Sequence, residues 1–383
     1  MELLFVRIGL NLLQARPETG GAWSYIARII DLLVLYGGGD EYFAYCSPMS
    51  LPLVANSSEI SIRLAQRVGS GQITRILYEN TWLDRTARND KLDVLHWFGN
   101  TKALSSRFPA AVTINDLRSF ESLTAYSPTR MLYARAMIPW SVKRAAALFP
   151  ISETTSLALQ QRFGIGPEKV FVVYYPLGAD WRPRSAIDVD SLRKRYDLPA
   201  TFWLYVAHCY PHKNHRTLFE AYARLVACNS NAWPLVLRAD DKPGGVDLGK
   251  LAQEYGIGEH IIRIPKLELD EMILLYSAAT ALVFPSQYEG LGIPLLEALA
   301  CACPAIASAI PTTQELAGDN VIQCDPTDAE SFTRAMKQFQ DEPGVLAAYA
   351  RRGVECVKKF SPHSVFRAIQ AGYQTACQTG RHS

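Results

Sequence analysis

Short apolar runs alternate with longer segments of helical periodicity along the whole sequence. This alternation is typical of parallel sheets wound with helices on both faces, so we predict an α/β fold of doubly wound parallel sheets. The strands expected in the first half of the chain are residues 4–10, 42–46, 60–64, 94–97, 111–114, 147–151 and 170–174. The helices expected between them are residues 22–36, 72–88, 130–146 and 153–163, with Ser152 as the N-cap of the last.

The pattern stops at residues 175–184, which contain two prolines and a glycine and have no periodicity. Such composition suits an interdomain linker. A second alternation follows, with strands expected at residues 202–206, 235–237, 261–264, 281–284, 305–307 and 321–324. We therefore predict two Rossmann-like domains, residues 1–185 and 186–360, with the active site in a cleft between the carboxyl ends of their strands.

Composition narrows the class of protein. The 383 residues carry a formal charge of +2, which argues against nucleic acid as a partner. Eight scattered cysteines do not resemble a secreted disulfide scaffold, and Glu2 stands where a signal peptide needs a basic residue. We expect a cytoplasmic protein with free thiols. Cys301 and Cys303 are too close in sequence for a zinc pair, so we expect no metal site there.

The most informative segment lies where the strand at 281–284 leads through an irregular loop into a helix. An acid, two glycines and the first helical residue occur there as Glu289, Gly290, Leu291, Gly292 and Ile293. Glycines allow close approach to a ligand, and a helix N-terminus favours an anion or a sugar oxygen. Glu297 follows in an otherwise apolar stretch of that helix. These residues predict a binding site for an extended, hydroxylated anion. In the alternative interpretation, Glu289 is a solvated acid of the loop and Glu297 is a surface residue of the helix.

The spacing of Glu289 and Glu297, with residues 300–308, 314–319 and 325–326 behind them, resembles the donor-site block of retaining nucleotide-sugar glycosyltransferases of family 4. The resemblance implies the GT-B fold, a donor-binding second domain and an acceptor-binding first domain. It also implies that a C-terminal helix within 361–383 returns to the first domain. In the family the first glutamate contacts the donor sugar and the second holds the ribose, and the Gly290–Ile293 backbone lies beside the donor.

A second match lies at residues 205–214, where a strand runs into a loop and a helix. Lys213 is the expected electrophilic residue, because an ammonium beyond a strand end can neutralise a diphosphate leaving group. His208 stands where relatives often have arginine or serine, so it is a further catalytic candidate that carries full charge only when protonated. A packed loop histidine and a solvated lysine are the alternatives.

The first domain has weaker signals. Gly20 and Gly21 open a helix after the first strand and resemble the family's glycine pair beside the diphosphate, with Trp23 next to them as an acceptor contact. Asn115 occupies the place of a family histidine and Asp116 follows it; both are candidate acceptor contacts, although Asn115 cannot titrate and Asp116 equally suits a turn. His96 stands where the family has a histidine at the end of a strand, and we expect it to have a structural role.

The resemblance implies transfer of a hexose from a nucleoside diphosphate sugar to a hydroxyl of a glycan or lipid-linked glycan, with retention. Lys213 and the helix that starts near Ile293 are expected to stabilise the charge of the leaving diphosphate, so we expect neither a metal nor another cofactor. The sequence resembles bacterial O-antigen and exopolysaccharide mannosyltransferases, which favours GDP-mannose as donor. Two alternatives stay open, namely a catalytically silent sugar-nucleotide-binding subunit and an epimerase or phosphorylase on the same fold.

The charge is unevenly distributed. Residues 1–185 hold 20 Lys and Arg against 15 Asp and Glu, whereas residues 186–383 hold 19 against 22. A basic first domain suits peripheral contact with an anionic membrane at the inner face of the cell membrane or with a lipid diphosphate acceptor. An ordinary solvated surface explains the charge equally well. The basic stretch concerned comprises Arg63, Arg67, Arg75, Arg85, Arg88 and Lys91.

Overall fold

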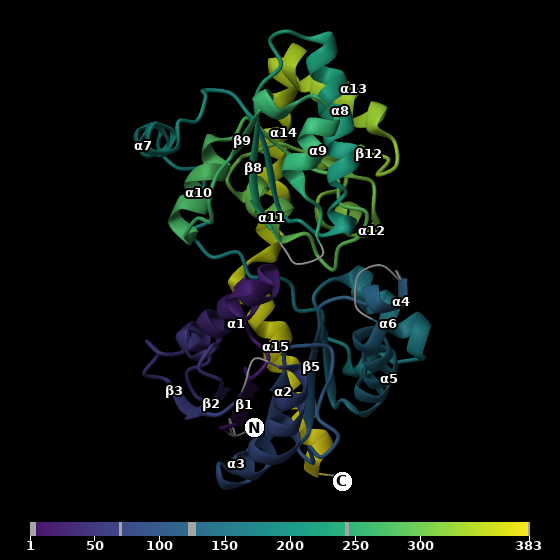
Figure 1. Cartoon of the computed structure of the whole chain (residues 1–383). Coiled ribbons are helices and arrows are strands. Elements are labelled where there is room, and N and C mark those ends of the chain that lie inside the picture. Colours follow the sequence, from purple (N-terminus) through teal and green to yellow (C-terminus); the bar gives the residue numbers. More distant parts are fainter. Residues whose placement is uncertain (1–4, 69–70, 122–127, 242–244, 382–383) are drawn as a thin grey trace. The chain divides into compact units, whose positions relative to one another are not determined.

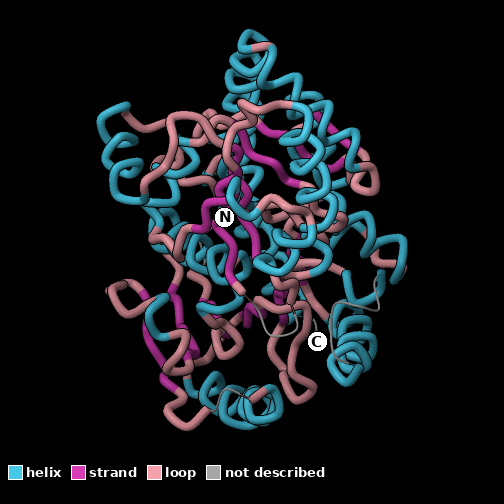
Figure 2. The backbone as a smooth tube through the Cα atoms, turned by 45° about the horizontal axis from the view of Figure 1, so that its top comes forward, coloured by secondary structure: helices cyan, strands magenta, loops and turns pink. Residues whose placement is uncertain are grey.

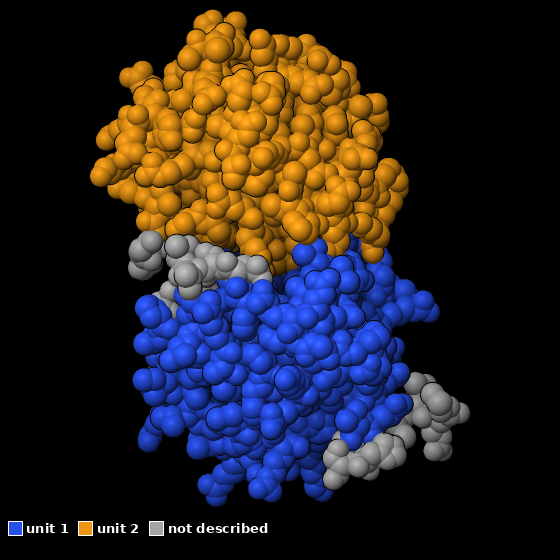
Figure 3. Space-filling model, turned by 90° about the vertical axis from the view of Figure 1, so that its right-hand side faces the viewer, with its two compact units in different colours: residues 1–176, 360–383 blue, residues 177–359 orange. Residues whose placement is uncertain are grey.

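The computed structural model describes residues 5–68, 71–121, 128–241 and 245–381. The chain divides into two compact units (Figure 3). Unit 1 comprises residues 1–176 and 360–383, and unit 2 comprises residues 177–359. The first unit thus ends at Pro176, inside the segment predicted as a linker, and residues from Leu177 onward pack with unit 2.

Unit 1 contains a parallel six-stranded sheet of order β3-β2-β1-β4-β5-β6 (Figure 1). Its strands are β1 (Arg7–Asn11), β2 (Glu41–Cys46), β3 (Ile60–Leu64), β4 (Val94–Trp97), β5 (Ala110–Ile114) and β6 (Ala147–Pro150). Strands β4 and β5 are buried throughout, as expected for parallel strands covered on both faces.

The helices of unit 1 are α1 (Gly21–Tyr36), α2 (Gln72–Tyr78), α3 (Asp84–Asn89), α4 (Arg118–Glu121), α5 (Pro128–Arg144), α6 (Glu153–Phe163) and α15 (Pro362–Arg381). A π-helical turn, Glu79–Leu83, joins α2 to α3, so the single helix predicted over 72–88 is interrupted. Ser152 caps α6 as predicted, because its Oγ accepts the Thr155 N–H. Helix α15 packs on α1, β4, β5 and β6 of unit 1.

Unit 2 repeats this topology with a parallel sheet of order β12-β11-β10-β7-β8-β9. The strands are β7 (Trp203–His208), β8 (Leu235–Asp240), β9 (Ile261–Arg263), β10 (Ala281–Phe284), β11 (Ala305–Ser308) and β12 (Ile322–Cys324). The helices are α7 (Ala186–Tyr196), α8 (His215–Cys228), α9 (Leu248–Glu254), α10 (Leu269–Ala278), α11 (Ile293–Ala300), α12 (Pro311–Leu316), α13 (Ala329–Asp341) and α14 (Pro343–Val357). In both units helices surround the strands (Figure 2).

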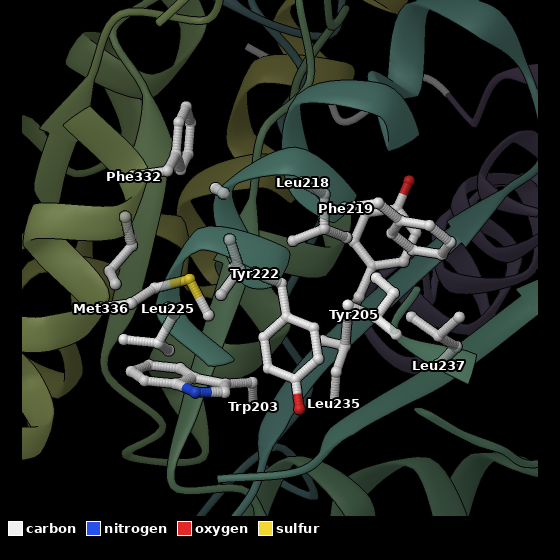
Figure 4. Packing of buried hydrophobic residues seen from close by; sticks show 14 of the residues in the cluster. Trp203, Tyr205, Leu218, Phe219, Tyr222, Leu225, Leu235, Leu237, Phe332 and Met336 are labelled. Carbon is white, nitrogen blue, oxygen red and sulfur yellow. The ribbon is translucent and has the colours of Figure 1, made fainter. Parts of the chain in front are cut away.

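Large side chains from β7, β8, α8 and α13 fill the core on one face of the unit 2 sheet (Figure 4). Trp203 and Tyr205 of β7 and Phe219 and Tyr222 of α8 are each at most 1% exposed. Burying one such aromatic side chain stabilises the fold by roughly 2–3 kcal/mol. This packing fixes β7 and α8, and therefore the loop between them.

The two sheets share a position at which the strand order reverses. In unit 1 the chain winds from β1 to β2 and β3 on one side, and β4 pairs with the other side of β1. In unit 2, β8 and β9 lie on one side of β7 and β10 on the other. Ligands of doubly wound sheets bind at the carboxyl ends of the strands at this switch point. The β1/β4 and β7/β10 ends are therefore the places to look for a site.

Two strand predictions need correction. Residues 170–174 form no strand, although Val170 makes an isolated bridge to Leu148 and two backbone hydrogen bonds follow β6 as far as Val173. The proline at 176 ends this extended edge before a full ladder forms. The first strand begins at Arg7 rather than at residue 4, and Phe5 is 73% exposed; Leu4 lies outside the described residues.

Hydropathy gives no spanning segment: none of the described helices is long and apolar enough to cross a membrane. All eight cysteines are free thiols, as predicted, and five of them are buried.

Candidate functional site

Lys213 and Glu289 meet at the switch point of unit 2. Lys213 ends the short 3-10 helix that follows β7, and Glu289 lies in the loop after β10. The Lys213 Nζ lies 2.5 Å from Glu289 Oε1, and both side chains are almost nine-tenths buried. The structure thus brings together two of the residues predicted as catalytic. Their pairing balances the two charges and presents an ammonium and a carboxylate at one edge of the sheet.

Asn214 holds the backbone around this ion pair, a role that no sequence motif predicted. Its Nδ2 donates to the carbonyl oxygens of Pro285, at 3.0 Å, and Pro326, at 2.7 Å. Its φ of 60° lies in the left-handed region, which asparagine tolerates better than most residues. Asn214 therefore joins the loops after β7, β10 and β12. An asparagine directly before a helix was the only local signal of this role.

The predicted glycine loop lies at the N-terminus of α11. Gly292 is the N-cap of this helix and has a φ of 97°, a conformation that a side chain would strain. Ile293 begins the helix, Leu291 is buried, and Gly290 is partly exposed. The first N–H groups of α11 have no helical acceptor, so this end favours negative charge.

Glu297 is buried in α11, so the alternative interpretation of this residue as a solvated surface glutamate is wrong. It is 9% exposed, and its Oε2 accepts a hydrogen bond of 3.0 Å from the Tyr276 hydroxyl of α10. Burial and the Glu297 charge raise the pKa of Tyr276 well above its usual range, so this phenol stays a donor. The structure therefore holds the Glu297 carboxylate in one orientation.

His208 ends β7 beside its register partner Asp240, the last residue of β8. Its Nδ1 lies 3.3 Å from Asp240 Oδ2, and Arg238 Nη1 lies 2.8 Å from Asp240 Oδ1. His208 and Arg238 therefore contact the two oxygens of one carboxylate. His208 thus lies at the same carboxyl edge of the sheet as Lys213. A side chain that contacts a diphosphate is expected at this edge.

Three buried hydroxyls gather at this edge without hydrogen-bond partners among the described residues. They belong to Ser286 after β10, Ser308 at the end of β11 and Thr313 in α12, and each is at most 1% exposed. A buried hydroxyl without a partner costs roughly 1–3 kcal/mol. A ligand entering this edge would find hydrogen-bond donors there, and no sequence motif points to these three residues.

The predicted contacts of unit 1 begin with Gly20 and Gly21. Gly20 has a φ of 60° and is the N-cap of α1, and Gly21 is the first residue of that helix. Trp23 is partly exposed in its first turn. This junction follows β1, so the glycine pair lies at the carboxyl edge of the unit 1 sheet.

Asn115 and Asp116 have internal partners at the end of β5. The Asn115 Nδ2 donates to the Phe98 carbonyl at 3.0 Å, and Asp116 Oδ1 accepts the Arg118 N–H at 3.1 Å. Asn100, with a φ of 62°, accepts the Asn115 N–H at 2.7 Å and joins the loops after β4 and β5. The Asp116 contact is the turn role that the sequence left open.

His96 is structural in geometry. It is 1% exposed in β4, and its Nδ1 and Nε2 lie 2.8 Å from the hydroxyls of Tyr373 and Thr113. Burial lowers its pKa to about 3. His96 therefore joins α15 to the sheet. No cluster of three or more His, Cys, Asp or Glu suited to a metal ion occurs among the described residues.

Comparison with known proteins finds a family match within the second unit. Residues 190–355 match the family described as "Glycosyl transferases group 1". The matched segment covers most of unit 2, residues 177–359. Lys213, Glu289 and Glu297 all lie within the matched residues.

Several similar proteins are named as mannosyltransferases. The chain is 27% identical over 254 residues to "O-antigen chain mannosyltransferase B" of Escherichia coli, covering 66% of each protein. It is 32% identical over 205 residues to "Serotype-specific mannosyltransferase WbdA" of Escherichia coli, covering 52% of this chain and 25% of that protein. It thus spans about two thirds of the length of the first relative and a quarter of the second.

Solved structures share the fold over almost the whole chain. The protein titled "Anabaena Alr3699/HepE in complex with UDP and glucose" has a TM-score of 0.77 at 19% identity, covering 95% of this chain and 98% of that one. WaaG, "a glycosyltransferase involved in lipopolysaccharide biosynthesis", has a TM-score of 0.75 at 15% identity, with the same coverage. The predicted GT-B fold is confirmed.

Proposed function

We propose that this protein is a hexosyltransferase of surface polysaccharide synthesis that moves mannose from GDP-mannose to a hydroxyl of a glycan or lipid-linked glycan. The observation that carries the proposal is the Lys213–Glu289 pair, 2.5 Å apart at the switch point of unit 2. The names of the mannosyltransferase relatives support the choice of sugar. The donor and the retention of anomeric configuration rest on the resemblance.

The geometry suggests how the charges work. Negative charge grows on the diphosphate as the bond to the anomeric carbon breaks, and Lys213 and the N-terminus of α11 stabilise it. The donor diphosphate displaces Glu289 from Lys213, and the freed carboxylate accepts hydrogen bonds from sugar hydroxyls. Glu297, held by Tyr276, accepts from the ribose. His208 adds a donor to phosphate, and its charge depends on pH.

Proton transfer completes the reaction. The acceptor hydroxyl attacks the anomeric carbon, the bond to the diphosphate breaks, and the leaving phosphate oxygen takes the hydroxyl proton. No side chain is assigned as general base, and no metal or cofactor is part of the proposal.

A turnover assay with radiolabelled GDP-mannose and octyl α-D-mannoside tests this function. Lys213→Ala should lower kcat about 10²–10³-fold, as expected for loss of one group that stabilises the leaving charge. Lys266→Ala, an exposed lysine of the same unit, should leave kcat unchanged. Near-normal turnover by the Lys213 variant would refute the site. An α-linked product, detected by NMR, would establish retention.

Nucleotide specificity is measured separately by thermal shift. GDP should raise the melting temperature more than UDP or dTDP, because a tight ligand stabilises the folded state by mass action. Stabilisation by UDP alone would mean that the donor carries uracil instead of guanine, and the proposed transferase activity would still stand. Nucleotide binding without turnover over a panel of donors and acceptors would favour the silent-subunit alternative, and interconversion of the free nucleotide sugar would favour an epimerase.

We also propose peripheral contact of unit 1 with anionic lipid. Helix α5 carries four Lys and Arg and no acid, and Leu132 on it is 73% exposed. On α2, Ile73 and Leu77 are 76% and 56% exposed, one helical turn apart. An exposed face that combines basic and apolar residues suits an anionic bilayer surface.

Some arginines of the basic stretch named in the sequence are paired with acidic residues. Arg63 pairs with Asp90 at 2.6 Å and Arg88 with Asp84 at 2.5 Å, while Arg75 donates to Gln14. The charges of Arg63 and Arg88 are therefore largely balanced within unit 1. The contact rests instead on the exposed faces of α2 and α5.

Vesicle flotation tests the membrane contact. Wild-type protein should float with phosphatidylglycerol vesicles at low salt and not with phosphatidylcholine. Ile73→Glu with Leu77→Glu should abolish flotation, whereas Ile187→Glu, on α7 of the other unit, should not. No association at low salt would remove the membrane proposal and leave the transferase intact.

A further inference from the structure

The switch point of unit 1 holds a polar cluster for which neither the sequence motifs nor the proposed donor site accounts. Asn11 ends β1, and its Nδ2 donates to Glu79 Oε1 at 3.1 Å. Glu79 begins the π-helical turn and is 7% exposed. Burial raises the pKa of Glu79, although the Arg75 charge and Asn11 oppose the rise. A carboxyl group is therefore held at depth beside the strand end.

Arg75 and Gln14 complete the near side of this cluster. The Arg75 Nη1 donates to Gln14 Oε1 at 3.1 Å, and its Nε lies 3.9 Å from Glu79 Oε2. That Nε is buried and has no hydrogen-bond partner among the described residues. Gln14 follows β1, so its amide and the guanidinium lie at the β1 side of the switch point.

Residues from β4 and α5 approach the same cluster. A Cβ at Gly99, just after β4, would lie 1.9 Å from the Gln14 Oε1, so the absence of a side chain there makes room for the amide. Tyr133 of α5 is hydrogen-bonded to Thr101, and the charges of Arg75 and Glu79 both act on it. Gln14, Arg75, Thr101 and Tyr133 are each partly exposed.

The chemistry of the cluster suits a neutral polyol. An amide and a guanidinium donate to hydroxyl oxygens, a phenol donates and accepts, and a carboxyl accepts. Arg75 and Glu79 balance each other in charge, which does not favour an anion. The π-helical turn at Glu79 is a feature that recurs at functional sites, because its extra residue costs helical hydrogen bonds.

The two units support the same interpretation by their shared topology. In unit 2, Lys213 after β7 meets Glu289 after β10, and these are the proposed donor contacts. In unit 1, Gln14 after β1 meets Gly99 after β4 at the equivalent switch point. Doubly wound sheets bind ligands at this position.

We propose that Gln14, Arg75, Glu79 and Tyr133 form the subsite that recognises the terminal sugar of the acceptor. The inference rests on the proposed transferase function and adds to it the residues that select the acceptor. Arg75 and Gln14 donate to sugar hydroxyls, and Glu79 orients Arg75. These residues bind and select the acceptor and do not act on the donor.

The decisive experiment separates acceptor from donor steps in the full-length protein. Transfer from GDP-mannose to octyl α-D-mannoside and hydrolysis of GDP-mannose without acceptor are measured in parallel. Arg75→Met and Gln14→Leu should lower kcat/KM for the mannoside at least tenfold, mainly by raising its KM, and Tyr133→Phe should lower it less. Hydrolysis and the GDP thermal shift should stay within twofold and about 1 °C of wild type.

Arg85→Met serves as the matched control, because Arg85 is exposed on α3 of the same helical stretch. It should leave both reactions unchanged. A parallel loss of transfer and hydrolysis in the Arg75 and Gln14 variants would overturn the subsite, as would normal transfer. If Arg75→Met fails to fold, Arg75→Lys and Glu79→Gln, which keep charge and shape respectively, should still raise the mannoside KM.

Direct binding distinguishes failure of this proposal from failure of the proposed function. Saturation-transfer NMR of octyl α-D-mannoside with the GDP-bound protein should show binding that Arg75→Met removes and Arg85→Met retains. If wild-type protein turns over no GDP-mannose, the proposed function fails, and the NMR result still decides the subsite. A wild-type protein that hydrolyses GDP-mannose but binds no mannoside overturns the subsite alone.

Discussion

The two units use the same strand order and differ in what they place at the switch point. Unit 2 places a lysine and a glutamate there, both on the loops that follow strands. Unit 1 places amide side chains on its loops and brings its charges, Arg75 and Glu79, from a helix that follows β3. Loop motifs in a sequence therefore reveal a binding site only when the residues that bind the ligand lie on the loops.

The loops beside the two switch points are held by asparagines in the left-handed conformation. Asn214 is 6% exposed and donates to two carbonyls, whereas Asn100 is partly exposed and donates to the Asp116 carbonyl at 3.1 Å. Asn214→Gly should lower the free energy of unfolding by about 2 kcal/mol, because two buried hydrogen bonds are lost. Asn214→Ala should cost about 1 kcal/mol more, from the positive φ.

The same substitutions at Asn100 supply the comparison. Each should cost less than at Asn214, because water replaces the lost partners of a half-exposed side chain. Calorimetric unfolding of the four variants measures the difference. Equal costs at the two positions would show that the loops are held by other contacts.

Buried histidines contrast the units in a second way. His96 of unit 1 has hydroxyl partners on both nitrogens, whereas His215, at the start of α8, has none among the described residues. His96→Leu should lower the free energy of unfolding by about 2 kcal/mol, since two buried hydroxyls lose a partner. His215→Leu should be neutral or stabilising, which denaturation by urea will show. Destabilisation of comparable size by both variants would contradict the contrast.

Both histidines predict acid sensitivity. Burial lowers the pKa of His96 to about 3, and burial with the Lys213 charge lowers that of His215 to about 4, below the ordinary value of 6.5. Between the folded and unfolded pKa values, the unfolded chain therefore binds protons at these histidines and the folded chain does not. Above about pH 6.5 the two histidines do not reduce the free energy of unfolding. As the pH drops toward 4, this free energy falls by up to about 1.4 kcal/mol per pH unit for each histidine.

A pH series of melting temperatures measures this loss. His215→Leu should flatten the dependence between pH 6.5 and 4, because one of the two linked protons is removed. His260→Asn, which changes an exposed histidine, should leave the slope as it is in wild type. An unchanged slope in the His215 variant would refute the linkage.

The smallest expected effect sharpens the comparison at unit 1. Gly99→Ala should displace the flexible end of Gln14, which a Cβ would meet at 1.9 Å, and raise the mannoside KM a few-fold. Stability should change by less than about 1 kcal/mol, because the side chain can move. Gly258→Ala, where a Cβ meets nothing within 4 Å, is the control. Loss of GDP-mannose hydrolysis in the Gly99 variant would contradict a role confined to the acceptor.

Most elements could be predicted because their signals are local. The apolar run at 281–284 and the cap at Ser152 appear in the structure as expected. The strand expected at 170–174 failed because its ladder depends on a partner, β6, and not on its own composition. Of the candidate site, Lys213 and Glu289 were found from their places after strands, but Asn214, with partners distant in sequence, was not.

Local sequence was enough to predict the alternation of strands and helices, the glycine at the N-cap of α11 and the charged residues after β7 and β10. The partners of these side chains follow from tertiary packing. Lys213 and Glu289 are 76 residues apart, and His96 and Tyr373 are 277 apart. Periodicity and capping arise within a few residues, whereas such pairs depend on the strand order that packing selects.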